Sequence, residues 1–340
     1  MLLTGHTGFK GAWLSLWLQS LGAELTGLAP GPPTRPSLYE LAGVSAGVQE
    51  HAVDVRDAAG VRDVLRSALP EIVFHMAAQP MVRRSLKDPA LTYEVNVMGT
   101  VNVLDAIRLA EGDVRAVVVV TSDKCYENSG DTARRFAEGD PLGGEDPYSS
   151  SKACAELLTG AYRSSFFSAE RSPGVASARA GNVIGGGDWG EDRLLADVVR
   201  AIQSGEPVRL RNPQAVRPWQ HVLNPLSGYL RLAERLYQTR EVARAWNFGP
   251  AADDIQSVRW IVERLALLWG EGLSWELDDH VNPPEAGHLA LDSSAAERGL
   301  GWRPGWDLER GLERIVEWHR AFGSGGDMRA VSLAQIEQFP

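Results

Sequence analysis

Short apolar runs alternate with helical patterns through the first half of the chain. Valines fill positions 117–120 without a polar break, and such a strand is typically buried on both faces, as in a parallel sheet covered by helices. The pattern therefore predicts an α/β protein with a doubly wound, Rossmann-like parallel sheet. Strands are predicted at 2–4, 24–28, 50–54, 72–75, 116–121 and 175–178, and helices at 12–21, 61–68, 96–110 and 149–165.

The pattern changes near residue 181, where loops rich in Trp, Asn and Arg begin, as in GGGDWGEDR, NPQAVRPWQH and DDHVNPPEAGH. One more strand is predicted at 246–248 and a late amphipathic helix at 308–321. We expect a sheet domain and a second, smaller substrate-binding domain, with the ligand between them. Their predicted extents are 1–182 with about 225–252, and about 183–224 with 253–340.

Composition narrows the class of partner. The chain has 340 residues and a net charge of −10, which argues against nucleic acid. The two cysteines, Cys125 and Cys154, make no disulfide framework and favour a cytoplasmic setting. The stretch MLLTGHTGFKG is too short and too glycine-rich for a signal peptide, and no apolar run reaches membrane-spanning length. The seven histidines lack the spacing of metal ligands. We therefore expect a small-molecule ligand, no membrane contact and no metal.

A glycine-rich turn follows the first predicted strand and opens a helix. It reads Gly5-His6-Thr7-Gly8-Phe9-Lys10-Gly11. Glycines let the backbone approach a pyrophosphate at a helix N-terminus, where the helix dipole favours an anion. The spacing differs from the common G-x-G-x-x-G, and an ordinary strand-to-helix turn is the alternative interpretation.

Two other strand ends could contact the same ligand. Ala77, Ala78 and Gln79 follow the fourth strand, and the small residues would let a flat cofactor pass close to the backbone. Asp54, at the end of the third predicted strand, could accept a hydrogen bond from an adenine amino group. The alternatives are that the segment 77–79 simply starts a helix and that Asp54 is a solvated carboxylate. After the second strand, at Leu28, no ribose-binding carboxylate follows.

Tyr148 and Lys152 share one face of a predicted helix, because they are four residues apart. A nearby ammonium favours the phenolate, so we expect it to lower the pKa of Tyr148 until the phenolate can take a hydroxyl proton near neutrality. A chance surface pair is the alternative. The valine strand also ends in Thr121, Ser122, Asp123 and Lys124, a density of polar chemistry that a strand end does not need.

These features together resemble the extended short-chain dehydrogenase/reductase family, with its TGxxGxxG turn, AAQ turn, Ser/Thr strand end and YxxxK. Longer segments resemble its CDP-glucose 4,6-dehydratase subfamily almost end to end. They are GHTGFKGAWLSLWLQSLGA, AAQPMVRRS, NVMGTVNVLDAIR, TSDKCYEN, DPYSSSKACAELL, ARAGNVIGGGDWGEDRL, RPWQHVL and LGWRPGW.

The resemblance implies a reaction and a role for each group. Tyr148, beside Lys152, takes the C4 hydroxyl proton of CDP-glucose while NAD takes the hydride. Ser122 hydrogen-bonds the C4 oxygen, and Asp123 protonates the leaving C6 hydroxyl. Lys124 takes the C5 proton, where related dehydratases carry Glu; a lysine is a base only when it is neutral. The hydride then returns to C6 and gives CDP-4-keto-6-deoxyglucose.

The resemblance also implies two sets of binding residues. For NAD they are Gly5, Thr7, Gly8, Phe9, Lys10, Gly11, Asp54, Val55, Ala77, Ala78, Gln79, Asn96, Thr121, Tyr148 and Lys152. For the nucleotide sugar they are Gln79, Arg83, Asn182, Arg193, Arg217 and His221. Two positions depart from the family pattern: Asn224 stands where a carboxylate is frequent, and Ala295 where Lys is usual.

Further expectations come from the family. NAD is favoured over NADP, although Arg35 lies near the ribose end. Because the first strand is short for the middle of a sheet, we expect the natural chain to begin upstream of Met1 or that strand to be weakened. The family usually dimerises through the helices predicted at 96–110 and 149–165, so a homo-oligomer, a dimer or tetramer, is expected.

Three alternatives remain. A nucleotide-sugar 4-epimerase would share the fold, NAD and YxxxK, but would need no acid and base after Ser122. A dehydratase acting on another nucleotide hexose would carry out the same chemistry on a substrate with a different nucleotide. An idle dinucleotide-sensing protein would have a broken YxxxK, whereas Tyr148 and Lys152 are both intact.

Overall fold

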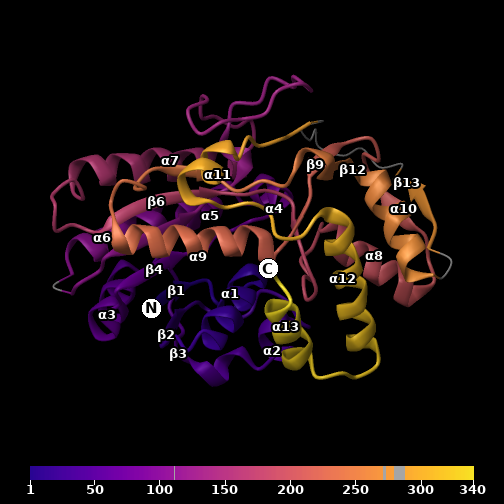
Figure 1. Ribbon diagram of the computed structural model, residues 1–340, viewed down its shortest axis with the longest axis horizontal. Helices are drawn as coiled ribbons and strands as arrows, with labels where there is room; N and C mark the ends of the chain where they lie inside the picture. The colour runs from indigo at the N-terminus through magenta and orange to yellow at the C-terminus, as the bar shows by residue number, and fades with distance from the viewer. Residues whose placement is uncertain (111, 271–272, 279–287) are drawn as a thin grey trace.

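Seven parallel strands form the central sheet, which confirms the predicted α/β fold class (Figure 1). The computed structural model describes residues 1–110, 112–270, 273–278 and 288–340. The strand order is β11-β6-β5-β4-β1-β2-β3, and each pair in this sheet is parallel. The strands are β1 (Leu2–Thr4), β2 (Leu25–Leu28), β3 (Val48–His51), β4 (Ile72–His75), β5 (Ala116–Val120), β6 (Gly174–Arg179) and β11 (Ala245–Asn247).

Helices cover both faces of the sheet, and this explains the unbroken valine run. Val118 and Val120 of β5 pack in the apolar cluster on one face, whereas Val117 and Val119 pack in the cluster on the other. Neither side of the strand therefore meets water. The covering helices are α1 (Phe9–Ser20) and α9 (Leu223–Gln238) on the first face, and α3 (Ala58–Ala68), α6 (Gly99–Arg108) and α7 (Pro147–Ser165) on the second.

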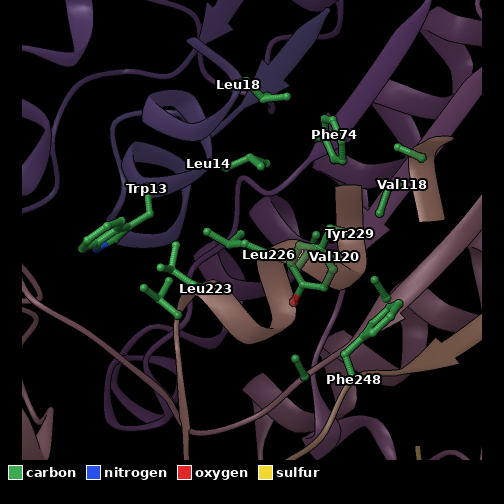
Figure 2. Packing of buried hydrophobic residues seen from close by; sticks show 14 of the residues in the cluster. Trp13, Leu14, Leu18, Phe74, Val118, Val120, Leu223, Leu226, Tyr229 and Phe248 are labelled. Atoms are coloured by element: carbon green, nitrogen blue, oxygen red, sulfur yellow. The ribbon is translucent and has the colours of Figure 1, made fainter. Parts of the chain in front are cut away.

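Figure 2 shows how α1 and α9 meet over the sheet. Trp13 and Leu14 of α1 face Leu226 and Tyr229 of α9, next to Val120 of β5. Each of these side chains except Val120 is at most 1% exposed, and burying a large apolar side chain stabilises a fold by about 1.5–3 kcal/mol. The two helices thus hold the glycine-rich turn, whose last residues form the start of α1, firmly against the sheet.

The second domain lies to one side of the sheet, at the right in Figure 1, and has its own apolar cluster around α8, α10 and α12. Three short strand pairs form outside the central sheet: β7 with β10, β9 with β12, and β8 with β13. These elements are α8 (Leu194–Ser204), α10 (Val258–Trp269), α12 (Leu308–Gly323), β7 (Val183–Ile184), β8 (Val208–Leu210), β9 (Val216–Pro218), β10 (Gln220–His221), β12 (Ile255–Ser257) and β13 (Trp275–Leu277). Residues 279–287 of the predicted loop DDHVNPPEAGH fall outside the described residues.

Shorter elements complete the chain. They are α2 (Leu38–Leu41), α4 (Val82–Lys87), α5 (Pro89–Tyr93), α11 (Ser294–Leu300), α13 (Met328–Glu337), the π-helical turn η2 (Glu94–Met98) and the 3₁₀ turns η1 (Val44–Gly47), η3 (Asp123–Cys125) and η4 (Ala252–Asp254). No helix within the described ranges is long and apolar enough to cross a membrane.

The prediction was wrong at the third strand. The structure has β3 at Val48–His51 rather than 50–54, so Asp54 lies three residues beyond its end. The backbone turns there because the Asp54 carboxylate accepts a hydrogen bond from the Arg56 amide at 2.9 Å and its carbonyl accepts one from the Asp57 amide at 2.9 Å. Asp57 then caps the N-terminus of α3. The predicted helix 96–110 is also divided, into the π-helical turn η2 and α6.

Candidate active site

A cleft of about 960 Å³ opens over the carboxyl ends of β1, β4 and β5 and reaches into the second domain. It lies where the strand order reverses between β4 and β1, the place where open α/β sheets bind ligands. Its lining includes the predicted residues Gly5, Thr7, Gly8, Phe9, Lys10, Gly11, Asp54, Val55, Ala77, Ala78, Gln79, Arg83, Thr121, Ser122, Asp123, Lys124, Tyr148, Lys152, Asn182, Arg193 and Arg217. Asn96 and His221 do not line it.

Steric limits explain the glycines at the first end of the cleft. Gly5 has a φ of 75°, and a Cβ there would lie 2.8 Å from Cα of Ala77. A Cβ on Gly11 would lie 2.1 Å from the carbonyl oxygen of Gly5. Gly8 is the N-cap of α1 and supplies no side-chain cap, so the first amides of the helix can bind an anion in the cleft. The predicted mechanism of this turn fits its geometry.

Asp54 lies at the edge of the same end, half-buried and bound to Arg56. Its Oδ2 pairs with Nη2 of Arg56 at 2.9 Å, and the hydrogen bonds from Arg56 lower the pKa of the carboxyl. The group is therefore an ionised acceptor near neutral pH. Its predicted contact with adenine stays a prediction, and Val55 lines the cleft beside it.

Asn96 does not occupy the position that was expected. It is 2% exposed, its Oδ1 accepts from the Gln79 amide at 2.8 Å, and its Nδ2 donates to the Gln79 carbonyl at 3.1 Å and to Oγ of Ser151 at 2.9 Å. Both of its amide protons and one acceptor position thus bind the protein, and because Asn96 does not line the cleft, a direct cofactor contact does not fit. Asn96 instead holds the turn after β4 against α7. The Gln79 side chain is likewise bound to Met81 and Thr92.

Tyr148 and Lys152 lie side by side on the first turns of α7, whose N-cap is Asp146. Burial raises the pKa of Tyr148 to about 12, while the Ser122 hydrogen bond and Arg193 act in the opposite direction. Burial also lowers the pKa of Lys152 to about 8, and its Nζ donates to the Val120 carbonyl at 3.4 Å. The expectation that Lys152 brings the Tyr148 pKa near neutrality was wrong, because the effect of burial outweighs the Ser122 hydrogen bond and the Arg193 charge.

Asp123 is a buried acid at the bottom of the cleft, 1% exposed. Its Oδ1 accepts from Oγ of Ser122 at 3.0 Å, and its Oδ2 has no hydrogen-bond partner among the described residues. Burial raises the pKa of this carboxyl, against the opposing effects of Lys124 and Arg217. A carboxyl kept protonated by its surroundings can donate a proton to a leaving group.

Gly181 makes room for that acid and was missed in the sequence. A Cβ at this position would lie 1.6 Å from Oδ2 of Asp123 and 2.0 Å from its Cγ. Only glycine therefore allows the carboxyl its place. The AGN segment that holds Gly181 carries no local sign of this contact, because Asp123 is 58 positions away, which follows from the two residue numbers.

Two lysines approach the acid from different elements. Lys124 is partly buried in the cleft and its amide donates to Oγ of Ser122 at 3.2 Å. Lys10, from the glycine-rich turn, donates through Nζ to the Tyr229 hydroxyl at 3.0 Å. Burial, followed by the charges of Lys152 and Arg193, lowers the Lys10 pKa to about 7. Several potential cations thus surround Asp123 in the cleft, a setting suited to a phosphate-bearing substrate.

Arginines line the second end of the cleft. Arg193 is the N-cap of α8, and Arg217 lies on β9 with 6% of its surface exposed. Arg83 pairs with Asp192 at 3.4 Å, and Arg211 pairs with the same carboxylate at 3.1 Å. Asp192 and Arg211 were not predicted, although Asp192 adjoins Arg193 in GGGDWGEDR. Asn182, with a φ of 44°, accepts at its carbonyl from the Gln220 amide at 3.3 Å.

His221 is not part of the cleft, and its predicted contact with the diphosphate does not fit its position. It is 0% exposed and its ring packs between Trp13 and Trp306, with centroid distances of 6.1 and 4.9 Å. Its Nδ1 accepts from the Leu223 amide at 3.3 Å. Burial lowers its pKa to about 3, so the ring is neutral. It is a core residue of the interface between α1 and the C-terminal segment.

The two departures from the family pattern lie outside the chemistry. Asn224 is 1% exposed; its Nδ2 donates to the Trp306 carbonyl and its Oδ1 accepts from the amides of Gly305 and Trp306. It therefore ties α9 to the segment before α12. Ala295 packs against the core around α9. Within the described residues, no group of three or more His, Cys, Asp or Glu side chains could hold a metal ion.

Known proteins match this chain over nearly its whole length. The family model described as GDP-mannose 4,6 dehydratase matches residues 2–315. CDP-glucose 4,6-dehydratase of Salmonella typhimurium is 48% identical, over 100% of this chain and 95% of the relative. UDP-glucose 4-epimerase of Thermus thermophilus, solved with NAD, superposes with a TM-score of 0.79 at 26% identity, over 94% of this chain and 98% of that one.

A dehydratase has the same architecture. The structure of dTDP-glucose 4,6-dehydratase from Streptomyces venezuelae, with NAD bound, superposes with a TM-score of 0.77 at 24% identity, over 96% of this chain and 99% of that one. The match to a family model over residues 2–315 and the 48% identity of a full-length relative decide the membership. The chain belongs to the GDP-mannose 4,6 dehydratase family.

Proposed function

We propose that the protein is an NAD-dependent hydro-lyase that converts CDP-D-glucose into CDP-4-keto-6-deoxy-D-glucose and water. The observation that carries the proposal is the buried acid Asp123 with Lys124 beside it, in one cleft with Ser122, Tyr148 and Lys152. Oxidation alone needs only the last three groups. The acid and the adjacent amine supply what an elimination adds, and the 48% identical relative is a CDP-glucose 4,6-dehydratase.

The residues at the glycine-rich end fit a dinucleotide. Gly5 and Gly11 stand where a side chain would collide with backbone, and the uncapped start of α1 offers amides to a diphosphate. NAD, when bound there, would accept the hydride from C4 of the sugar and return it to C6. In this proposal residues 1–182 and about 225–252 hold NAD, and about 183–224 and 253–340 hold the nucleotide sugar, with Arg193 and Arg217 on its diphosphate.

Tyr148 takes the C4 hydroxyl proton as the hydride leaves. The phenolate is needed for this step, and the groups that favour it are the Ser122 hydrogen bond, Arg193 and the Lys152 ammonium one turn along α7. The resulting 4-ketone acidifies the proton on C5. Lys124, as a neutral amine, takes that proton, and Asp123 gives its own proton to the C6 hydroxyl, which leaves as water.

The protons of this cycle balance within the cleft. Lys124 returns its proton to C5 when the hydride arrives at C6. Tyr148 has then gained one proton and Asp123 has lost one. The Ser122 hydroxyl donates to the Asp123 carboxyl at 3.0 Å and lies close enough to the Tyr148 phenol to lower its pKa. In this proposal it passes the proton from Tyr148 to Asp123 and restores both groups without solvent.

We further propose that the protein acts as a cytoplasmic homo-oligomer. Large apolar side chains are exposed on α5, η2 and α7, where Tyr93, Met98 and Leu157 are 38%, 50% and 62% exposed. Of these elements, η2 and α7 overlap the helices through which the family usually dimerises, and α5 directly precedes η2. Covering this apolar surface would favour association. Light scattering of the purified protein would reveal the oligomeric state.

The decisive experiment is incubation with CDP-glucose and NAD, followed by alkali and measurement of the ultraviolet absorbance of a 4-keto sugar. The same assay with the dTDP, UDP and GDP hexoses tests the alternative of another nucleotide. Conversion of CDP-glucose into its C4 epimer, without a keto product, would replace the dehydratase by an epimerase. Absence of any conversion of all four substrates would overturn the proposal.

A further inference from the structure

A buried ion pair lies directly under the active-site cleft. Nη2 of Arg179 is 2.7 Å from Oε2 of Glu156, and the two side chains are 4% and 2% exposed. Arg179 is the last residue of β6, and Glu156 lies on α7 one turn beyond Lys152. Neither residue lines the cleft, so neither can touch a substrate. Burying the two charges of this ion pair costs desolvation free energy, and apolar residues often stabilise such a position equally well. The presence of the ion pair therefore needs an explanation.

Hydrogen bonds from the ion pair reach the chain on both sides of the catalytic segment. Oε1 of Glu156 accepts from Oγ1 of Thr121 at 2.5 Å. Nη1 of Arg179 donates to the Tyr126 hydroxyl at 2.7 Å. Thr121 immediately precedes Ser122, Asp123 and Lys124, whereas Tyr126 follows them after one residue. Each member of the pair therefore anchors one end of the segment that carries the acid and the adjacent amine.

Further bonds make this anchor rigid. Oε2 of Glu156 also accepts from Oγ of Ser177 at 2.7 Å, and Nη1 of Arg179 also donates to the Glu138 carbonyl at 3.1 Å. The Tyr126 hydroxyl donates in turn to Oδ1 of Asn247 on β11 at 2.7 Å. The network thus joins α7, which carries Tyr148 and Lys152, to β5, β6 and β11. It holds the groups for oxidation and those for elimination in one register.

Glu156 also acts on Lys152 through its charge. Burial lowers the Lys152 pKa to about 8, and Glu156 is the main group that opposes this fall. Lys152 is also faced by the Cys125 thiol of η3, by Lys10 of α1 and by His75 of β4. The latter two interact with it unfavourably when they are charged. Among these neighbours only Glu156 supplies a carboxylate.

The surroundings of Glu156 itself hold two cations. Arg179 of β6 binds it directly, and the charge of Glu156 also acts on Arg163 on α7. The Cys125 thiol faces it from η3. The Glu156 carboxylate therefore lies between Arg179 and the amine of Lys152, which is one helical turn away on α7.

We propose that Glu156 and Arg179 are positioning residues with separable tasks. Glu156 holds Lys152 in the ammonium form that favours the Tyr148 phenolate, and Arg179 holds the 122–126 segment in register for the elimination. The second task rests on the proposed dehydratase function. The first task concerns only the protonation of a lysine and can be tested without any substrate.

The first test titrates Lys152 in the cofactor-free protein. Acetic anhydride acetylates neutral amines, and mass spectrometry of the peptide that carries Lys152 gives the extent of reaction at each pH. Glu156→Gln should lower the midpoint by about one pH unit or more, as expected for loss of an adjacent opposite charge. Because Glu156→Gln leaves Arg179 buried without its partner, the double variant Glu156→Gln/Arg179→Met, which restores neutrality, is measured beside it and should show the same fall.

Arg179→Lys is the matched control, because it alters the same buried site but keeps both the Glu156 carboxylate and a cation beside it, whereas Arg179→Met would leave that carboxylate buried without its partner. Its Lys152 midpoint should not fall. An unchanged midpoint in both variants that lack the carboxylate would overturn the first task. An equal fall in Arg179→Lys would also overturn it, since the shift would then follow from altered packing.

The second test separates oxidation from elimination in a single turnover with CDP-glucose. Arg179→Met should accumulate reduced cofactor and release keto product about tenfold more slowly or worse, since small misplacements of reacting groups have effects of this size. Arg179→Lys should recover part of the loss. Equal slowing of both steps would overturn the second task. If the unaltered protein forms no keto product, the proposed function fails while the Lys152 titration stands.

Discussion

The two ends of the active-site cleft differ in the groups that form them, which are backbone amides at one end and side chains at the other. At the cofactor end, one continuous turn, Gly5–Gly11, offers backbone amides to the ligand, and its glycines leave space where side chains would collide. The chemistry end joins side chains from separate segments, with Asp123 after β5, Tyr148 on α7 and Arg217 on β9. A single side-chain change at the chemistry end should therefore stop the reaction without weakening cofactor binding. At the cofactor end, atoms added to a glycine should weaken cofactor binding.

The largest expected effect tests the chemistry end through Lys124. In Lys124→Met the C5 proton has no acceptor, so oxidation proceeds and elimination stops. Turnover should fall by about two or more orders of magnitude, as for loss of a positioned base, while reduced cofactor accumulates on the enzyme. Near-ultraviolet absorbance of the reduced nicotinamide and the alkali assay measure the two steps separately.

A different result for Lys124→Met would contradict the assignment of Lys124 as the base at the chemistry end. If its ammonium only supported Asp123, whose pKa it lowers, Lys124→Met would slow the reaction modestly and no reduced cofactor would be trapped. Product formation at the unaltered rate would require another base in the cleft.

Replacing Tyr148 by Phe removes one hydroxyl at the same end of the cleft with little change of shape. C4 oxidation should fall by about a hundredfold or more, because the group that accepts the hydroxyl proton is lost. Cofactor affinity, measured by calorimetry, should change little. Unlike Lys124→Met, this variant should accumulate no reduced cofactor; rapid reduction in a well-folded Tyr148→Phe would assign the proton transfer to another group.

The cofactor end is tested by adding one methyl group. A Cβ at position 11 would lie 2.1 Å from the Gly5 carbonyl oxygen, so Gly11→Ala must displace the turn. Such overpacking costs about 1–3 kcal/mol, and NAD affinity should fall about tenfold to a hundredfold while the chemistry residues remain in place. Gly160→Ala on α7 is the control, since an added Cβ there would have its nearest neighbour in the flexible Arg163 side chain, at 3.6 Å.

Equal NAD affinities in Gly11→Ala and Gly160→Ala would mean that the turn does not bind the cofactor. Thermal denaturation of both variants without NAD separates a lost binding site from a lost fold.

The smallest effect concerns His221, which the structure assigns to the core and not to the cleft. Its pKa is about 3 in the folded protein, against an ordinary value of 6.5. The unfolded chain therefore binds more protons below pH 6.5, and stability falls as pH decreases. His221→Asn, whose Oδ1 can replace Nδ1 as the acceptor from Leu223, should reduce the loss of stability between about pH 6.5 and pH 5 by about 1.5 kcal/mol.

Urea unfolding at each pH measures that difference against the unaltered protein, which also removes the opposing contribution of Asp123. The KM for the nucleotide sugar should not change in His221→Asn. A large increase in KM with an unaltered pH dependence of stability would return His221 to the substrate site.

Local patterns were sufficient for the features that depend on neighbours in the chain. The valine run predicted a doubly covered strand, the Gly5–Gly11 spacing predicted a turn that opens a helix, and the four-residue spacing of Tyr148 and Lys152 predicted a shared helix face. Each of these is a property of a few consecutive residues and of helix or strand geometry. The pKa of Tyr148 was not predictable in this way, because it depends on how much water the fold removes around it.

Tertiary structure decided which residues of the same type meet the ligand. His221 and Asn96 occur in motifs beside true cleft residues, yet one packs between Trp13 and Trp306 and the other binds the Gln79 backbone. Asp54 lies beyond its strand because a turn intervened.

The sequence by itself determined the fold class, the cofactor turn and the list of reactive groups, since these depend on periodicity and on residue chemistry. Only the tertiary structure decided that Gly181 leaves space for the Asp123 carboxyl and that Glu156 and Arg179 anchor the segment between Thr121 and Tyr126. These contacts join residues far apart in the chain. Burial and distance, which set their energies, exist only once β5, β6 and α7 have packed together.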